Sequence, residues 1–165
     1  MALTVGDATY TTLKVVHILG VVLFLGGLAT SVFWKMSADR SNDPAFAARV
    51  HRRLRRADSR IVVPGALLTF AGGYSMIRLF GARIATQPVA LWGLILMFAA
   101  LAVWYFGMRP LATRLAVEAE ACEANRQPLS SEYGARSVAW LACAALANVL
   151  VIVVAVMMTV APPRP

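Results

Sequence analysis

Long apolar runs, each bounded by charged residues, dominate the pattern of hydrophobic and polar positions along this chain. Four runs are visible, over about residues 13–34, 61–80, 89–108 and 138–161. Each approaches the roughly 20 residues that an α-helix needs to cross a hydrocarbon core of about 30 Å. The pattern therefore predicts an all-α fold, a transmembrane four-helix bundle, with residues 1–165 forming a single integral membrane domain.

The polar segment between the first two runs has a helical pattern of its own. Asp43 followed by Pro44 is typical of an N-cap and the first position of a helix. Apolar residues then recur every three or four positions, at Phe46, Val50, Leu54, Ala57 and Ile61. His51 and five arginines occupy the opposite face, namely Arg52, Arg53, Arg55, Arg56 and Arg60. We expect an amphipathic basic helix over residues 44–60 that lies on the membrane surface or leads directly into the second span.

The polar segment after the third run also has helix signals. Leu111, Leu115 and Ala119 suggest that the third helix continues beyond the membrane. Gln127-Pro128 is expected to break it, and Ser130 or Ser131 to cap the fourth helix.

Composition supports a membrane protein and argues against a nucleic-acid-binding one. Of the 165 residues 59% are hydrophobic and only 15% are charged, whereas soluble domains carry roughly 25% charged residues. The net charge of +8 resides mainly beside the ends of the apolar runs, where basic residues determine topology and contact anionic lipid. The expected partners are therefore the lipid bilayer, with anionic lipids at the basic helix 44–60, and no nucleic acid.

The distribution of the 16 lysines and arginines predicts the orientation of the bundle. Eight lie in the first polar segment, at Lys35, Arg40, Arg49, Arg52, Arg53, Arg55, Arg56 and Arg60, and four in the second, at Arg109, Arg114, Arg126 and Arg136. The other side holds Lys14, Arg78, Arg83 and Arg164. Basic loops stay in the cytoplasm, so we expect a bacterial inner-membrane protein with both termini outside, which in a Gram-negative cell is the periplasm.

Small residues recur on the predicted spans. They are Gly20, Gly26 and Gly27 on the first span, Gly65, Thr69, Gly72 and Gly73 on the second, and Ala139, Cys143 and Ala147 on the fourth. Small side chains allow transmembrane helices to approach closely. We expect these faces to pack against neighbouring helices.

His17 is the strongest candidate for chemistry, because it is the only histidine within a span and lies about one turn below the outer surface. Lys14 precedes it by three residues on the same helix face. One interpretation is an interhelical hydrogen bond, with Asn148, Thr69 or Tyr74 as the partner. The other is a metal or haem ligand.

A haem iron in a helical bundle usually takes histidine together with a second histidine or a methionine. His51 lies on the cytoplasmic side, which excludes a bis-histidine haem within one chain. Methionines at the right depth are Met76, Met157 and Met158, and Arg78 and Arg83 could meet haem propionates. The expected cofactor is haem b, with copper(I) as an alternative because it favours thioether and imidazole ligands. Each methionine also fits a role as core filler, and no cofactor at all is the third option.

Other functional signatures are missing from the sequence. The spans contain no Asp or Glu, which disfavours a transporter, and the chain has no nucleotide-binding loop and no Ser–His–Asp candidate set. Cys122 and Cys143 share no metal-type spacing.

The first span resembles a known family. It reads Leu13-Lys14-Val15-Val16-His17-Ile18 and continues to Gly26-Gly27-Leu28, as in DUF2269, a family of predicted bacterial integral membrane proteins. The segments Ala38–Ser41 and Ala57-Asp58 also resemble that family. The same helix is distantly similar to the CopD-like and HemJ-like group, which is linked to copper handling and haem-dependent oxidation. The resemblance implies a ligand role for His17 with Lys14 nearby, although the third span lacks the lysine of the HemJ-like pattern.

Two functions are consistent with these observations. The first is a haem- or redox-related role, as a subunit of a membrane oxidoreductase. The second is a non-catalytic accessory or scaffold subunit that packs through its glycine faces. Both predict a homo-oligomer or a larger membrane complex, and the sequence assigns no enzymatic reaction.

Overall fold

The computed structural model describes residues 5–79, 83 and 87–160, whose secondary structure is entirely helical. The elements in order are α1 (Val5–Ser41), α2 (Pro44–Ala57), η1 (Asp58–Val62), α3 (Val63–Leu79), α4 (Pro88–Ala102), η3 (Val103–Met108), α5 (Arg109–Ala124) and α6 (Ser131–Val160). η1 and η3 are single π-helical turns that join α2 to α3 and α4 to α5 without a break. Phe80 and Ala161, the last residues of the predicted second and fourth spans, lie outside the described residues.

The described residues therefore form four rods, Gly6–Ser41, Pro44–Leu79, Pro88–Ala124 and Ser131–Val160, each long and apolar enough to cross a membrane. A rod of 36 residues is about 54 Å long, nearly twice the thickness of a hydrocarbon core. Each rod must therefore project beyond the membrane. Many large apolar side chains along the predicted spans remain exposed, which is the expected surface for contact with lipid. The predicted all-α, four-span fold is confirmed.

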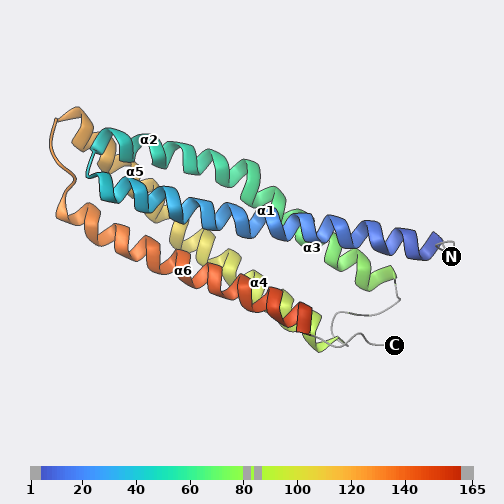
Figure 1. The fold of residues 1–165 in the computed structure, drawn as a ribbon. Helices are drawn as coiled ribbons and strands as arrows, with labels where there is room; N and C mark the ends of the chain where they lie inside the picture. The colour runs from blue at the N-terminus through green and yellow to red at the C-terminus, as the bar shows by residue number, and fades with distance from the viewer. Residues whose placement is uncertain (1–4, 80–82, 84–86, 161–165) are drawn as a thin grey trace.

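The rods are arranged as two long helix pairs (Figure 1). α1 packs along α3, α4 packs along α6, and α1 also contacts α6. α2 packs on α5 and α1. We call the end that carries the start of α1 and the end of α6 the terminus end, and the opposite end, with the turns at 42–43 and 125–130, the loop end (Figure 1).

Helix boundaries at the loop end follow the signals in the sequence. The Asp43 carboxylate caps α2 by accepting a hydrogen bond from the Ala45 amide at 2.9 Å, and Pro44 is the first helical residue. The Ser130 hydroxyl accepts a hydrogen bond from the Tyr133 amide at 2.9 Å and caps α6. The third rod continues beyond its span to Ala124, as predicted. Of the two placements expected for the basic helix, the structure has the one that leads directly into the second span.

One assignment on the basic helix was wrong. His51 was placed on the polar face with the arginines, but its side chain is only 1% exposed. Because α2 packs against both α1 and α5, its buried face is wider than a single stripe and includes Ala47, Ala48, Val50, His51 and Leu54. His51 lies at the centre of this wider face and points toward α6.

The close contact between α1 and α3 depends on glycines, as the small-residue pattern predicts. A Cβ atom on Gly20 would lie 2.4 Å from the backbone nitrogen of Thr69, and one on Gly65 would lie 2.6 Å from that of Phe24. Both distances are shorter than atoms tolerate, so any larger residue would force the helices apart. This contact fixes the register of α1 against α3 and thereby positions His17.

Candidate functional site

His17 is held against α3 by a hydrogen bond and by two glycines. Its Nδ1 atom lies 2.7 Å from the backbone oxygen of Thr69. A Cβ atom on Gly72 would lie 2.9 Å from the His17 backbone nitrogen, and one on Gly73 would lie 3.1 Å from the imidazole Cε1 and Nδ1 atoms. One of the interhelical hydrogen bonds expected for His17 is therefore present, with the main chain of Thr69 as its partner.

The hydrogen bond fixes the tautomer of His17. A backbone oxygen can only accept, so Nδ1 carries the proton and donates. Nε2 then keeps its lone pair, and within the described residues it has no hydrogen-bond partner. The imidazole is half-buried, which leaves Nε2 able to meet a ligand from outside the chain.

The other predicted site residues surround His17 unequally. Lys14 is exposed one turn before it, and Arg78 is exposed near the end of α3. Met76 is half-buried and follows Gly72 by four residues, so it lies on the same face of α3 one turn closer to the terminus end.

The methionines of α6 belong to the other helix pair. Met158 packs against α4, since a Cβ atom on Gly93 would lie 2.5 Å from its methyl carbon. Met157 is half-buried. Among the described residues, no three His, Cys, Asp or Glu side chains form a group that could hold a metal ion.

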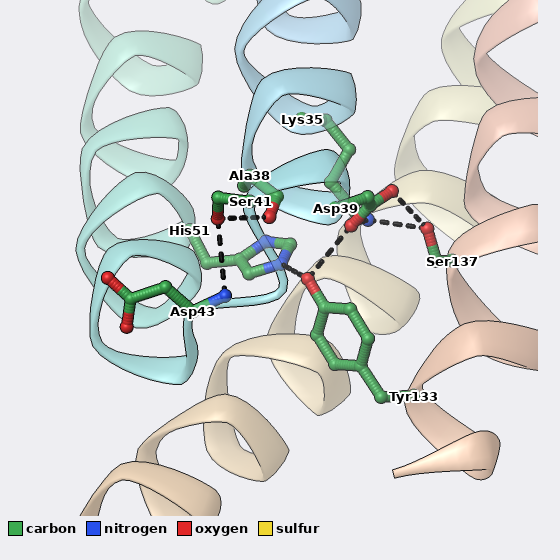
Figure 2. A network of polar contacts seen from close by, with 8 residues as sticks. All are labelled: Lys35, Ala38, Asp39, Ser41, Asp43, His51, Tyr133 and Ser137. Atoms are coloured by element: carbon green, nitrogen blue, oxygen red, sulfur yellow. Dashed lines mark hydrogen bonds and ion pairs between the residues drawn. The ribbon is translucent and has the colours of Figure 1, made fainter. Parts of the chain in front are cut away.

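A buried polar network lies at the loop end, away from the site that the sequence predicts around His17 (Figure 2). It joins α1, α2 and α6 through five side chains, Lys35, Asp39, His51, Tyr133 and Ser137. We call these residues the loop-end network.

The carboxylate of Asp39 is the centre of the loop-end network. It pairs with the Lys35 ammonium and accepts a hydrogen bond from the Ser137 hydroxyl. It also accepts one from the Tyr133 hydroxyl at 3.0 Å. Lys35 in turn donates to the Ser137 oxygen at 2.6 Å. The Asp39 carboxylate thus accepts hydrogen bonds from three donor groups on two helices, α1 and α6.

Tyr133 connects His51 to this carboxylate. Figure 2 shows the Tyr133 hydroxyl between the imidazole and Asp39, with 3.1 Å separating it from Nε2 of His51. Because the hydroxyl donates its proton to Asp39, His51 must donate from Nε2. The Nδ1 atom of His51 is buried and has no partner among the described residues. The result is a directed chain of hydrogen bonds from His51 through Tyr133 to Asp39.

Burial controls the ionisation of the loop-end network, which lies beyond the apolar spans. Burial, reinforced by the nearby Lys35 ammonium, lowers the pKa of His51 to about 4, so the imidazole is neutral at physiological pH. Burial also lowers the pKa of Lys35, although the hydrogen bond and attraction from Asp39 oppose that change. The pKa of Tyr133 is raised, first by burial and then by the Asp39 charge. A neutral imidazole and a neutral phenol therefore flank one buried ion pair.

The sequence contained a weak signal for this network. Lys35 and Asp39 are four residues apart, as are Tyr133 and Ser137, so each pair shares one helix face. Both pairs lie just beyond a predicted span, and Lys35 was counted only as a charge that determines topology. Spacing within one helix cannot show that α1 and α6 meet at these faces.

A second polar contact accompanies the two π-helical turns. Asp58 begins η1, and Trp104 and Arg109 belong to η3 and the start of α5. Burial raises the pKa of Asp58 to about 6, against the opposing effects of the Arg109 charge and the Trp104 indole. The Arg109 guanidinium lies 5.4 Å from the Trp104 ring centroid and 5.3 Å from that of Tyr105. The carboxylate of one junction thus lies near enough to the other junction for the Arg109 charge to influence its pKa.

Comparison with known proteins agrees with the fold and the first-span motif. No curated protein and no solved structure matches the chain. The model of one family does match, over residues 11–162, and that family is described as a predicted integral membrane protein, DUF2269. The match covers the last three rods, the first rod from residue 11 onward, His17 and the whole loop-end network. This four-helix membrane protein therefore belongs to the DUF2269 family.

Proposed function

We propose that the protein binds a haem iron through Nε2 of His17 and has a redox-related role in a bacterial inner membrane. The observation that carries this proposal is the hydrogen bond from His17 Nδ1 to the Thr69 carbonyl at 2.7 Å. Metal-binding histidines usually donate their second ring nitrogen to a carbonyl or carboxylate, which orients the ring and leaves the other nitrogen for the metal. His17 has this arrangement inside an apolar span.

The residues around His17 suit a haem more than a metal held only by the chain. One imidazole cannot hold an iron alone, but a porphyrin supplies four ligands and requires only one or two from the protein. Met76 would be the favoured second ligand, because it follows by four residues Gly72, which packs against His17. Lys14 and Arg78 are exposed near this end of the helix pair and would pair with propionates. A bound haem would supply one-electron chemistry, and copper(I) would use the same imidazole and thioether.

The proposed orientation places this site near the outer surface. Twelve of the 16 lysines and arginines lie between Lys35 and Arg60 or between Arg109 and Arg136, which are the segments nearest the loop end. The positive-inside tendency therefore favours a cytoplasmic loop end and a terminus end outside. Cysteine labelling with a membrane-impermeant reagent would test the orientation, at single cysteines introduced near Asp7 and near Arg126 after replacement of Cys122 and Cys143 by serine.

A difference spectrum tests the cofactor. The protein, purified in a mild detergent, should show a Soret band and reduced-minus-oxidised bands of haem, with iron confirmed by metal analysis. His17→Ala should lose the bands. His51→Gln, which removes the only other histidine and lies at the opposite end, should keep them. Copper without iron would identify the alternative metal. Protein that contains neither metal after expression with added haem and copper would refute the proposal, and the His17–Thr69 bond would then be a packing contact only.

A further inference from the structure

A groove on the outside of the bundle lies between α1 and α2, with a volume of about 510 Å³. Ligand sites are typically between roughly 300 and 1,000 Å³. Its long wall is apolar and includes Val22, Leu23 and Gly26 of α1 and Ile61 of η1. Val22, Leu23 and Ile61 are all exposed, so the protein itself leaves this wall uncovered.

The floor of the groove is open at Gly26. A Cβ atom on Gly26 would have no atom within 4 Å, whereas one on the adjacent Gly27 would lie 2.9 Å from the Val62 side chain. From Val22 to Trp34 the groove follows α1 for about 18 Å. That length is close to half of a hydrocarbon core of about 30 Å, which is the depth of one leaflet.

The charged end of the groove differs from its apolar wall. Arg49 and Arg53 are one turn apart on α2 and line the groove near Trp34. Both side chains are exposed, and within the described residues neither has a hydrogen-bond or ion-pair partner. Arg52, by contrast, pairs with Glu120 at 2.9 Å. Two adjacent guanidinium groups without carboxylates thus lie where the apolar span meets the polar part of α2.

We infer that the groove binds one anionic phospholipid, with a phosphate held by Arg49 and Arg53 and an acyl chain along Val22, Leu23 and Gly26. Guanidinium groups bind phosphate oxygens through paired hydrogen bonds. An indole at the level of a headgroup, as at Trp34, is typical of membrane interfaces. The site is separate from any cofactor at His17, because its lining on α1 begins at Val22 and includes neither His17 nor any residue of α3.

Native mass spectrometry tests this inference on the purified full-length protein. The probes are dioleoyl phosphatidylglycerol and dioleoyl phosphatidylcholine, which share acyl chains and differ in net charge. We expect one phosphatidylglycerol to bind at least tenfold more tightly than phosphatidylcholine. Each basic residue near an anionic surface contributes about fivefold, so Arg49→Gln/Arg53→Gln should weaken phosphatidylglycerol binding by about 25-fold.

Two matched controls separate this site from general attraction to a basic helix. Arg56→Gln/Arg60→Gln removes the same charge from outside the groove, and should change affinity by less than about threefold. Gly26→Leu should fill the floor and weaken binding of both lipids, whereas Gly134→Leu, where a Cβ atom also has no atom within 4 Å, should not. Equal weakening by both arginine pairs, or unchanged binding in Gly26→Leu, would overturn the inference. Circular dichroism would confirm that each variant is folded.

Discussion

The two partners of the ion pair in the loop-end network, Lys35 and Asp39, are buried to different extents, so their substitution should lower stability by different amounts. The Lys35 side chain is 0% exposed, whereas that of Asp39 is 23% exposed. Asp39→Ala removes the acceptor of three donors and leaves a buried ammonium without a counter-charge. Lys35→Met leaves a carboxylate that is still partly solvated and still accepts from Tyr133 and Ser137. The two substitutions break the same pair and should differ in cost.

The expected magnitudes follow from these contacts. Removing one partner of a buried ion pair, so that the other charge is stranded, costs about 3–5 kcal/mol, which is the expectation for Asp39→Ala. Lys35→Met loses the hydrogen bonds to Asp39 and Ser137 but leaves no buried charge without a partner, so it should cost less, about 1.5–3 kcal/mol. The double variant Lys35→Met/Asp39→Ala contains no stranded charge and should be more stable than Asp39→Ala alone.

Reversible unfolding in mixed micelles with increasing dodecyl sulfate, followed by circular dichroism, would give the three free energies. Glu132→Ala is the matched control, because Glu132 pairs with Arg136 at the same end but is 67% exposed, and its loss should cost below about 1 kcal/mol. An Asp39→Ala cost no larger than that of Lys35→Met, or a double variant whose cost equals the sum of the singles, would show that Lys35 is not stranded by the loss of Asp39.

Three further outcomes can be measured with the same unfolding assay. The folded state holds His51 neutral down to about pH 4, so the unfolded state binds more protons at this group and His51 makes stability rise with pH between 4 and 6.5, by up to roughly 3 kcal/mol. Asp58 acts in the opposite direction, because its folded pKa of about 6 exceeds the ordinary 3.8; its contribution is lost as pH rises from 3.8 to 6, so the two effects nearly cancel in the unmodified protein. His51→Gln should therefore give a stability that falls as pH rises through this window and Asp58→Asn a stability that rises, and identical profiles for the two variants would contradict these signs. Gly20→Ala should lower the free energy of unfolding by about 1–3 kcal/mol, because the added methyl group overpacks against the Thr69 backbone. Gly134→Ala adds the same group in open space and should lower it by less than about 1 kcal/mol, and equal losses in the two variants would mean that α1 and α3 separate freely.

The membrane fold could be predicted from the amino-acid sequence, because the interactions that control it are local or are made with the surrounding lipid and water. Twenty apolar residues in succession must cross a bilayer whatever their neighbours are. Helix caps depend on residues a few positions apart, so the sequence predicted the cap at Asp43 and narrowed the other to Ser130 or Ser131, of which the structure has Ser130. Glycines such as Gly20 and Gly65 showed where helices approach closely, although not which helices meet, whereas the expectation was wrong for Gly26, which faces open space. His17 was found because an ionisable side chain within an apolar run is conspicuous.

Which polar groups meet could not be predicted without the three-dimensional packing of the helices. The partner of His17 is a main-chain oxygen, and every residue has one, so no side-chain pattern could select Thr69. The loop-end network joins residues separated by as many as 102 positions, and each of its members has an ordinary reason to lie near a membrane surface. His51 was assigned to the polar face because the sequence of α2 shows one apolar stripe, which does not include it. In the structure α2 packs between α1 and α5, and this packing buries a wider face that includes His51. Burial, and the pKa changes that follow from it, depends on the distances between helices, and those distances arise only when all the rods are packed together.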